Sequence, residues 1–229
     1  MKATYNNLIK GIKKYFQKSK IKKAVIGVSG GIDSALSLKL VADAIGNKNI
    51  TSLIMPEKGL TKKQEVIDSI NLCRSLKVPY RIIEINTILK SFKGQNKISL
   101  MNLKPRIRML FLYNHANLNN ALVIGTSNKT ELKLGYFTKY GDGACDIEVI
   151  GDLYKTEVIS LAKYLKLPKK IIDKVPSAGL FKGQTDETEI GETYKNIDKM
   201  LKGKINNKIN KLIQKNKHKT EKIPIIKRK

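Results

Sequence analysis

The chain has 229 residues, and 41% of them are apolar, which is enough to bury a substantial core in one domain. Its 45 basic and 19 acidic residues give a net charge of +26, which raises a nucleic-acid partner as one interpretation. Only five of the 45 basic residues are arginines, the residue that bidentate recognition of bases prefers. We therefore attribute the charge mainly to lysine-rich coding and to small polyanionic ligands, and we do not expect nucleic acid as a partner.

The sequence gives no sign of a membrane protein. No apolar run reaches the ~18 residues that a membrane span needs, and no apolar segment follows the N-terminal lysines. The two cysteines, Cys73 and Cys145, have no metal-type spacing. This pattern favours a reducing cytoplasm and argues against a disulfide framework.

The periodicity of apolar residues predicts alternating helices and strands in the first half of the chain. We expect helices over 2–20, 35–45, 61–76 and about 105–116, and strands over 24–28, 50–55, 80–85 and 121–125. Thr61 and Gln64 have the spacing of a capping box, and Pro105 suits a first helical turn. Strands that alternate with helices indicate an α/β fold with a doubly wound parallel sheet of the Rossmann-like type.

The second half has a different character. Residues 135–152 are rich in glycine and aspartate and predict a functional loop. Helices are expected over 154–165, 186–201 and 205–217. We expect a single domain over 1–229, with a nucleotide-binding core at about 20–170 and a C-terminal helical part at about 171–229.

The first strand leads into a glycine-rich loop that predicts a phosphate cradle. Its sequence is Gly27-Val28-Ser29-Gly30-Gly31-Ile32-Asp33-Ser34. Glycines let backbone N–H groups approach an anion, and the following helix N-terminus adds partial positive charge. Asp33 would repel phosphate unless Mg²⁺ lies between them. The alternative is a plain strand-to-helix turn that is capped by Asp33 and Ser34.

This loop resembles the SGGxDS loop of the N-type ATP pyrophosphatases, which have the adenine nucleotide alpha hydrolase-like fold. In that superfamily the loop holds the pyrophosphate of ATP while a substrate atom attacks the α-phosphorus. The resemblance implies a catalytic and Mg²⁺-binding role for Asp33. It implies ATP binding by Gly27, Val28, Ser29, Gly30, Gly31, Ile32, Asp33 and Ser34.

The fourth predicted strand ends before Thr126, and Glu131 follows five residues later. In a doubly wound sheet this strand often lies beside the first, so both side chains should face the glycine-rich loop. A helix start with Thr126 as cap and Glu131 as a solvated acid is equally compatible with the spacing. The segment looks like the GT-x4-E motif of NAD synthetases, which implies an ATP contact for Thr126 and metal binding for Glu131.

Residues 137–146 read Phe-Thr-Lys-Tyr-Gly-Asp-Gly-Ala-Cys-Asp. Taken alone, they predict a flexible loop with one cation and two carboxylates, or an acidic surface turn. The run is similar to the F-T-K-Y-G-D-G-x-x-D signature of NAD synthetases and is the most discriminating match in the chain. The resemblance implies that Lys139 and Asp146 contact deamido-NAD.

Shorter stretches resemble the same family. Residues 102–109 resemble N-x-K-A-R-x-R-M, with Pro105 in place of the usual alanine, and 183–187 resemble its acidic G-Q-T-D-E turn. The matches imply ATP contacts for Lys155, with a catalytic role, and for Ser177, and deamido-NAD contacts for Arg106, His218 and Lys219. Without the resemblance, each of these residues could be an ordinary solvated side chain.

The resemblance implies ATP-dependent amidation of deamido-NAD by ammonia through an adenylylated carboxylate, with AMP and pyrophosphate as products, in a homodimer. About 25 residues precede the glycine-rich loop, too few for a glutaminase domain, so we expect free ammonia as the nitrogen donor. A tRNA-modifying ATP pyrophosphatase and a non-catalytic nucleotide- or RNA-binding module are the alternatives.

Overall fold

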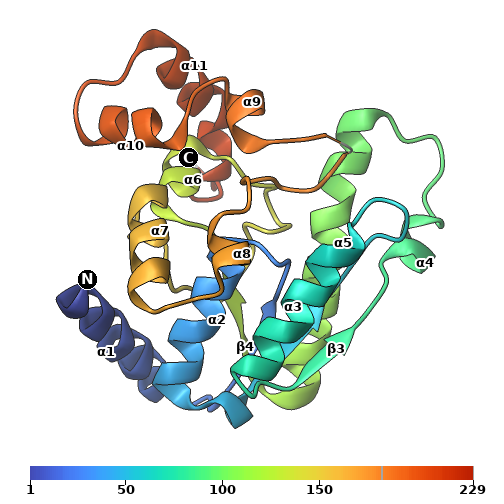
Figure 1. Ribbon diagram of the computed structural model, residues 1–229. Helices are drawn as coiled ribbons and strands as arrows, with labels where there is room; N and C mark the ends of the chain where they lie inside the picture. Colours follow the sequence, from blue (N-terminus) through green and yellow to red (C-terminus); the bar gives the residue numbers. More distant parts are fainter. Residues whose placement is uncertain (182, 229) are drawn as a thin grey trace.

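The computed structural model describes residues 1–181 and 183–228, and a five-stranded parallel sheet forms its centre (Figure 1). The strand order is β3-β2-β1-β4-β5, and every pairing is parallel. This confirms the predicted α/β sheet, in which the fourth strand lies beside the first and opposite the second. The strands are β1 (Lys23–Gly27), β2 (Ile50–Ile54), β3 (Tyr80–Ile82), β4 (Ala121–Gly125) and β5 (Ile147–Glu148).

Helices cover both faces of this sheet, because alternate side chains of a strand point to opposite faces. Ala24 and Ile26 of β1 belong to one apolar core, and Val25 between them belongs to another. The first core contains residues of α1 (Lys2–Ser19), α2 (Ile32–Ile45), α3 (Lys63–Ser75), α7 (Lys155–Tyr164) and α8 (Lys169–Ile172). The second is closed by α4 (Asn86–Leu89) and α5 (Lys97–Asn119).

The C-terminal helices pack on the helix that directly follows β4. This helix, α6 (Lys129–Leu134), shares a third core with α9 (Asp186–Ile190), α10 (Tyr194–Lys202) and α11 (Asn207–Asn216). Figure 1 shows this group together at the end of the molecule near α6. The C-terminal segment therefore lies near the carboxyl ends of β1 and β4.

Two predicted helix starts are wrong. The helix predicted from Pro105 begins eight residues earlier at Lys97, where the side chain of Asn96 accepts a hydrogen bond from Ser99 N at 2.8 Å. Pro105 thus lies inside α5, although it offers no N–H to the preceding turn. The helix predicted from Thr61 begins at Lys63, because Thr61 Oγ1 accepts from Glu57 N and closes a turn instead of a capping box.

The helix predicted over 186–201 is also interrupted. Gly191 ends α9 with φ +75°, in the left-handed region, and Thr193 caps a second helix, α10. Within the described residues, no helix is both long and apolar enough to cross a membrane.

Candidate active site

A cavity of about 300 Å³ opens at the carboxyl ends of the central strands. Residues 53–56 at the end of β2 and residues 124–127 at the end of β4 form part of its wall, together with the glycine-rich loop. Ligands of doubly wound sheets bind at this switch point. In the described part of the chain, every predicted ATP or metal residue except Gly30 lines the cavity: Gly27, Val28, Ser29, Gly31, Ile32, Asp33, Ser34, Thr126, Glu131, Lys155 and Ser177.

Gly30 lies against the neighbouring helix α3. Its φ is +75°, and a Cβ atom there would lie 2.7 Å from the carbonyl oxygen of Glu65. Both facts require glycine, because L side chains rarely adopt this conformation and the carbonyl belongs to a packed helix. ATP binding by Gly30 stays a prediction.

The start of α2 is suited to an anion. Gly31 is its N-cap, and among the described residues no side chain caps the first turn. The amides of this turn and the helix dipole are therefore available to a negatively charged ligand. The predicted alternative, a turn capped by Asp33 and Ser34, is wrong, because the Ser34 hydroxyl instead donates to Gly31 O at 3.0 Å.

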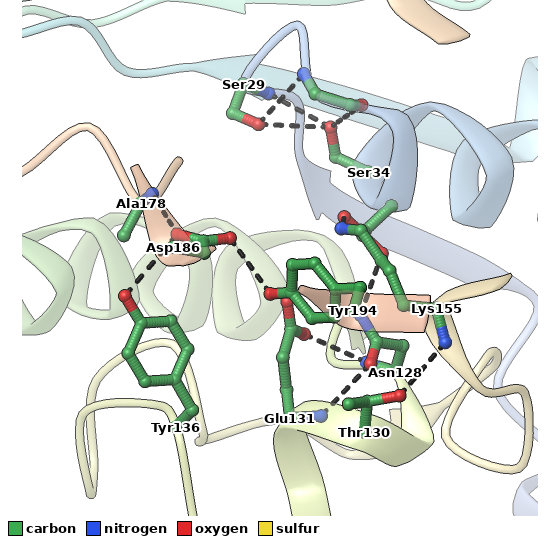
Figure 2. Close-up of polar contacts among 12 residues, drawn as sticks. Ser29, Ser34, Asn128, Thr130, Glu131, Tyr136, Lys155, Ala178, Asp186 and Tyr194 are labelled. Carbon is green, nitrogen blue, oxygen red and sulfur yellow. Dashed lines mark hydrogen bonds and ion pairs between the residues drawn. The ribbon is translucent and has the colours of Figure 1, made fainter. Parts of the chain in front are cut away.

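Asp33 links the glycine-rich loop to the helices that follow β4 and β5. Its Oδ2 atom accepts from Lys155 Nζ at 2.5 Å, and its Oδ1 atom accepts from Asn128 Nδ2 at 3.0 Å. Asn128 also caps α6, since its side chain accepts from Glu131 N while the Glu131 carboxylate accepts from Asn128 N (Figure 2). Asn128, and not Thr126, is thus the helix cap, and Glu131 is not a solvated acid.

Carboxyl groups outnumber the ammonium group of Lys155 in this part of the cavity. Lys155 is 1% exposed, and Asp33, Glu131 and Asp186 all act on it electrostatically. Burial, and then the charge of Asp33, raise the pKa of Glu131 well above its ordinary value, and burial also raises that of Asp186. Burial opposes the charged form of Lys155, but Asp33 and Glu131 outweigh it and raise the pKa of Lys155. The ammonium therefore stays charged among carboxyl groups that repel one another.

A buried aspartate on α10 sets the first turns of α6 and α7. Asp198 is 2% exposed and accepts hydrogen bonds from Thr130 Oγ1 at 2.5 Å and from Thr156 N at 2.9 Å. Thr130 Oγ1 in turn accepts from Lys155 N at 3.0 Å (Figure 2). Asp198 thereby fixes the helix starts from which Glu131 and Lys155 reach the cavity.

Four of the five predicted deamido-NAD residues form one basic cluster. Arg106 donates to the carbonyl oxygen of Lys139 at 3.3 Å, and Lys139 Nζ donates to that of His218 at 2.6 Å. Lys219 Nζ donates to the carbonyl oxygen of Phe137 at 2.9 Å. The structure thus brings together segments 106, 135–139 and 218–219 from three parts of the chain.

Asp146 contacts other elements. Its Oδ2 atom accepts from Val123 N at 2.7 Å, and its Oδ1 atom accepts from the Tyr113 hydroxyl of α5 at 3.3 Å. The Tyr15 hydroxyl of α1 donates to its carbonyl oxygen at 2.8 Å. Asp146 therefore lies beside α1 and α5 at the edge of the sheet.

Several side chains of the site were not identified from the sequence. Lys104 is 4% exposed, pairs with Glu57 at 2.8 Å and donates to Leu180 O at 2.7 Å. Asn128 and Asp198 act over long sequence separations. Asp186 carries one available signal, because it lies in the acidic run at 183–187, but the start of a helix accounts for acids equally well.

Comparison with known proteins identifies the family. The NAD synthase family model matches residues 4–228, nearly the whole chain. The chain belongs to the NAD synthase family. It is 54% identical over 182 residues to the NH(3)-dependent NAD(+) synthetase of Archaeoglobus fulgidus, a match that covers 78% of this chain and 74% of that protein.

Solved structures of NAD synthase relatives show the same fold over the same length. The NH3-dependent NAD synthetase of Campylobacter jejuni superposes with a TM-score of 0.80 at 37% identity and covers 99% of this chain and 98% of its own. The NMN synthetase of Francisella tularensis superposes with a TM-score of 0.92 at 36% identity and covers 98% of both chains. These findings confirm the resemblance, the adenine nucleotide alpha hydrolase-like fold and membership of a ligase family.

Proposed function

We propose that this chain catalyses the ATP-dependent amidation of deamido-NAD by ammonia, with NAD, AMP and pyrophosphate as products. The observation that supports this most directly is the meeting of an anion-binding helix start, Asp33, Glu131 and Lys155 in one cavity of an NAD synthase family chain. The relatives named as ammonia-dependent NAD synthetases favour this activity over the tRNA-modifying enzyme and the non-catalytic binding module.

A carboxylate is a poor electrophile, and adenylylation removes that obstacle. An oxygen of the nicotinate carboxylate attacks the α-phosphorus of ATP, and the bond to the β-phosphate breaks as pyrophosphate leaves. Ammonia then attacks the acyl carbon, AMP leaves with the electrons of the C–O bond, and the nitrogen loses one proton to water. The amides at the start of α2 and the ammonium of Lys155 stabilise the charge that develops on the phosphates, so catalysis rests on positioning and electrostatics.

The same cavity fits Mg²⁺. Asp33 and Glu131 both hydrogen-bond with Asn128. Burial, and then the charge of Asp33, raise the pKa of Glu131, and a bound cation would oppose both effects. No group of three or more His, Cys, Asp or Glu side chains in the described residues could hold a metal by itself. Two carboxylates that share Mg²⁺ with phosphate oxygens are the usual arrangement for this ion. When bound, Mg²⁺ would neutralise charge on the departing pyrophosphate.

We further propose that deamido-NAD binds to the basic cluster of Arg106, Lys139, His218 and Lys219, with Asp146 contributing from a second surface. Asp146 contacts α1 and α5 instead of this cluster. The resemblance to NAD synthetases implies a homodimer with the substrate near the subunit interface, and we propose the same assembly here. Light scattering should give twice the chain mass, and a fully active monomer would contradict the dimer.

Two free thiols accord with a reducing compartment. Cys73 is buried in the core, and Cys145 is half-buried beside Glu148. Burial raises the pKa of both thiols, so neither is an activated nucleophile at neutral pH. We propose that the enzyme works in the cytoplasm.

A second candidate function is the amidation of the mononucleotide. The NMN synthetase of Francisella tularensis gives a higher TM-score, 0.92 against 0.80, than the NAD synthetase of Campylobacter jejuni. Both reactions would activate a nicotinate carboxylate and differ in whether the substrate carries an AMP moiety. The ratio of kcat/KM for deamido-NAD to that for nicotinate mononucleotide separates the two.

The deciding assay incubates the purified protein with ATP, Mg²⁺, ammonium and deamido-NAD. We expect NAD, AMP and pyrophosphate in equal amounts, and less NAD when glutamine replaces ammonium. Pyrophosphate without NAD would keep the ATP chemistry but would reject this acceptor, and the mononucleotide and then tRNA would be tested next. If neither product forms while a relative is active in parallel, the proposed function is wrong.

A further inference from the structure

The hydroxyl of Tyr136 joins two segments that are far apart in the chain. It lies 2.7 Å from Glu189 Oε2 and 3.4 Å from Asp186 Oδ1, and both acceptors belong to α9. Figure 2 shows the contact with Asp186. Burial, and then the charge of Asp186, raise the pKa of Tyr136, so the hydroxyl stays protonated and acts as a donor at neutral pH. Tyr136 stands three residues before Lys139, at the beginning of the segment that carries the proposed substrate contacts.

The two acceptors of Tyr136 also hold the opposite wall of the cavity. Asp186 Oδ1 accepts from Ala178 N at 3.1 Å, and Glu189 Oε2 accepts from Gln184 Nε2 at 2.8 Å. The Ser177 hydroxyl donates to the carbonyl oxygen of Gln184 at 2.7 Å. Ser177 and Ala178 line the cavity, as does Tyr136 itself, so Tyr136 shares its acceptors with the proposed ATP-contacting loop.

The bond from Tyr136 to Asp186 cannot be exchanged freely for a bond to water, whereas Glu189 is exposed. Asp186 is 5% exposed, and its second oxygen accepts from the Tyr194 hydroxyl at 3.0 Å. A buried carboxylate that loses a hydrogen-bond donor is destabilised. If Ser177 and Ala178 move, either Tyr136 must move with them or Asp186 loses one of its donors. A movement of Ser177 and Ala178 is therefore passed on to Tyr136 and the segment that it begins.

We propose that Tyr136 is a positioning residue that couples nucleotide binding at Ser177–Ala178 to the placement of the Lys139 segment, so that ATP and the carboxylate substrate bind cooperatively. This inference rests on the proposed function. It requires no contact between Tyr136 and either substrate. Its effect passes through Asp186 and Glu189.

Isothermal titration calorimetry tests this coupling with α,β-methylene-ATP, in which the bond that would break is blocked. In the presence of Mg²⁺, saturating analogue should tighten deamido-NAD binding to the wild-type protein about 5-fold or more, within the usual range for coupled sites. In Tyr136→Phe this factor should fall to about 1, whereas each ligand alone should bind within about 2-fold of wild type. The matched control is Tyr164→Phe, which alters an exposed tyrosine on α7 and should keep the wild-type factor.

A second variant keeps the test independent of small folding defects. Glu189→Ala removes the nearer acceptor of Tyr136 and also the acceptor of Gln184 Nε2. It should lower the coupling factor, and adding Tyr136→Phe should cause no further loss, because both changes break the Tyr136–Glu189 bond. A coupling factor of 1 in the wild type, or an unchanged factor in Tyr136→Phe, would overturn the proposal. Failure of the wild type to bind deamido-NAD at all would overturn the proposed function and this inference with it.

Discussion

The ammonium of Lys155 lies 2.5 Å from the Oδ2 atom of Asp33, although 122 positions separate the two residues in the chain. This contact joins the first residues of α2 to the first residue of α7. Among the described residues, Lys155 is the only basic side chain that forms an ion pair with Asp33. The pair therefore holds together the two helix starts between which the phosphates of ATP would bind.

Lys155→Met should abolish most of the activity. The change removes the charge that balances Asp33 and Glu131, and breaking a buried pair of this kind costs about 3–5 kcal/mol. We expect kcat to fall about 100-fold or more and the free energy of unfolding to fall as well. Lys163→Met, on the exposed side of the same helix, is the control and should change neither. Wild-type pyrophosphate release by Lys155→Met would remove this lysine from the mechanism.

Asp198→Asn should weaken both the fold and the reaction. The amide group replaces a carboxylate oxygen that accepts from Thr130 or Thr156, so at least one buried donor loses its acceptor. We expect a loss of about 1–3 kcal/mol in the free energy of unfolding, measured by urea titration, and a lower kcat. Asp152→Asn, at a side chain that is 88% exposed, should leave both values unchanged.

Glu148→Gln should stabilise the protein at high pH. Burial raises the pKa of Glu148 to about 7 from 4.5, so between these values the folded chain holds a proton that the unfolded chain has lost. Wild-type stability therefore falls as the pH rises through this window, by up to about 3 kcal/mol from this group. The Tm of the variant should exceed that of the wild type at pH 8, and the gain should shrink toward pH 5. An equal difference at both pH values would show that Glu148 titrates normally.

Gly30→Ala and Gly11→Ala should have opposite effects. At Gly30 the new Cβ meets the carbonyl oxygen of Glu65 at a positive φ, so we expect a loss of about 1–3 kcal/mol and weaker ATP binding. At Gly11, within α1, the Cβ meets no described atom within 4 Å, and alanine should stabilise by about 0.5–1 kcal/mol. Thermal unfolding of the two variants side by side separates a backbone requirement from a general response to alanine.

Local sequence was sufficient for most of the fold. The four longer strands and the alternating helices follow from apolar periodicity, and each strand was placed within a few residues. Pro105 misled the prediction, since its preference for a first turn gave way to the packing of α5 against β1 and β4. The two residues of β5 are too few to carry a periodic signal, so they were taken as part of a loop.

The order of the strands was sufficient to predict that Thr126 and Glu131 lie at the same cavity as the glycine-rich loop, because the carboxyl ends of β1 and β4 meet there. Lys155, which also lines the cavity, was predicted only from the resemblance to NAD synthetases. Asn128 and Asp198 could not be found in this way. Their hydrogen-bond partners lie 95 and 68 residues away in the chain. A single sequence does not show which distant polar groups form hydrogen bonds with each other.

Asp198 has a consequence for the order in which the molecule is made. Synthesis runs from the N-terminus, and domains generally fold as units. Strands β1 to β4 and both of the helix starts that bear Glu131 and Lys155 emerge before α10. A nascent chain therefore contains all of these elements while the acceptor for Thr130 and Thr156 is still untranslated, and the candidate site can be completed only after α10 has been made.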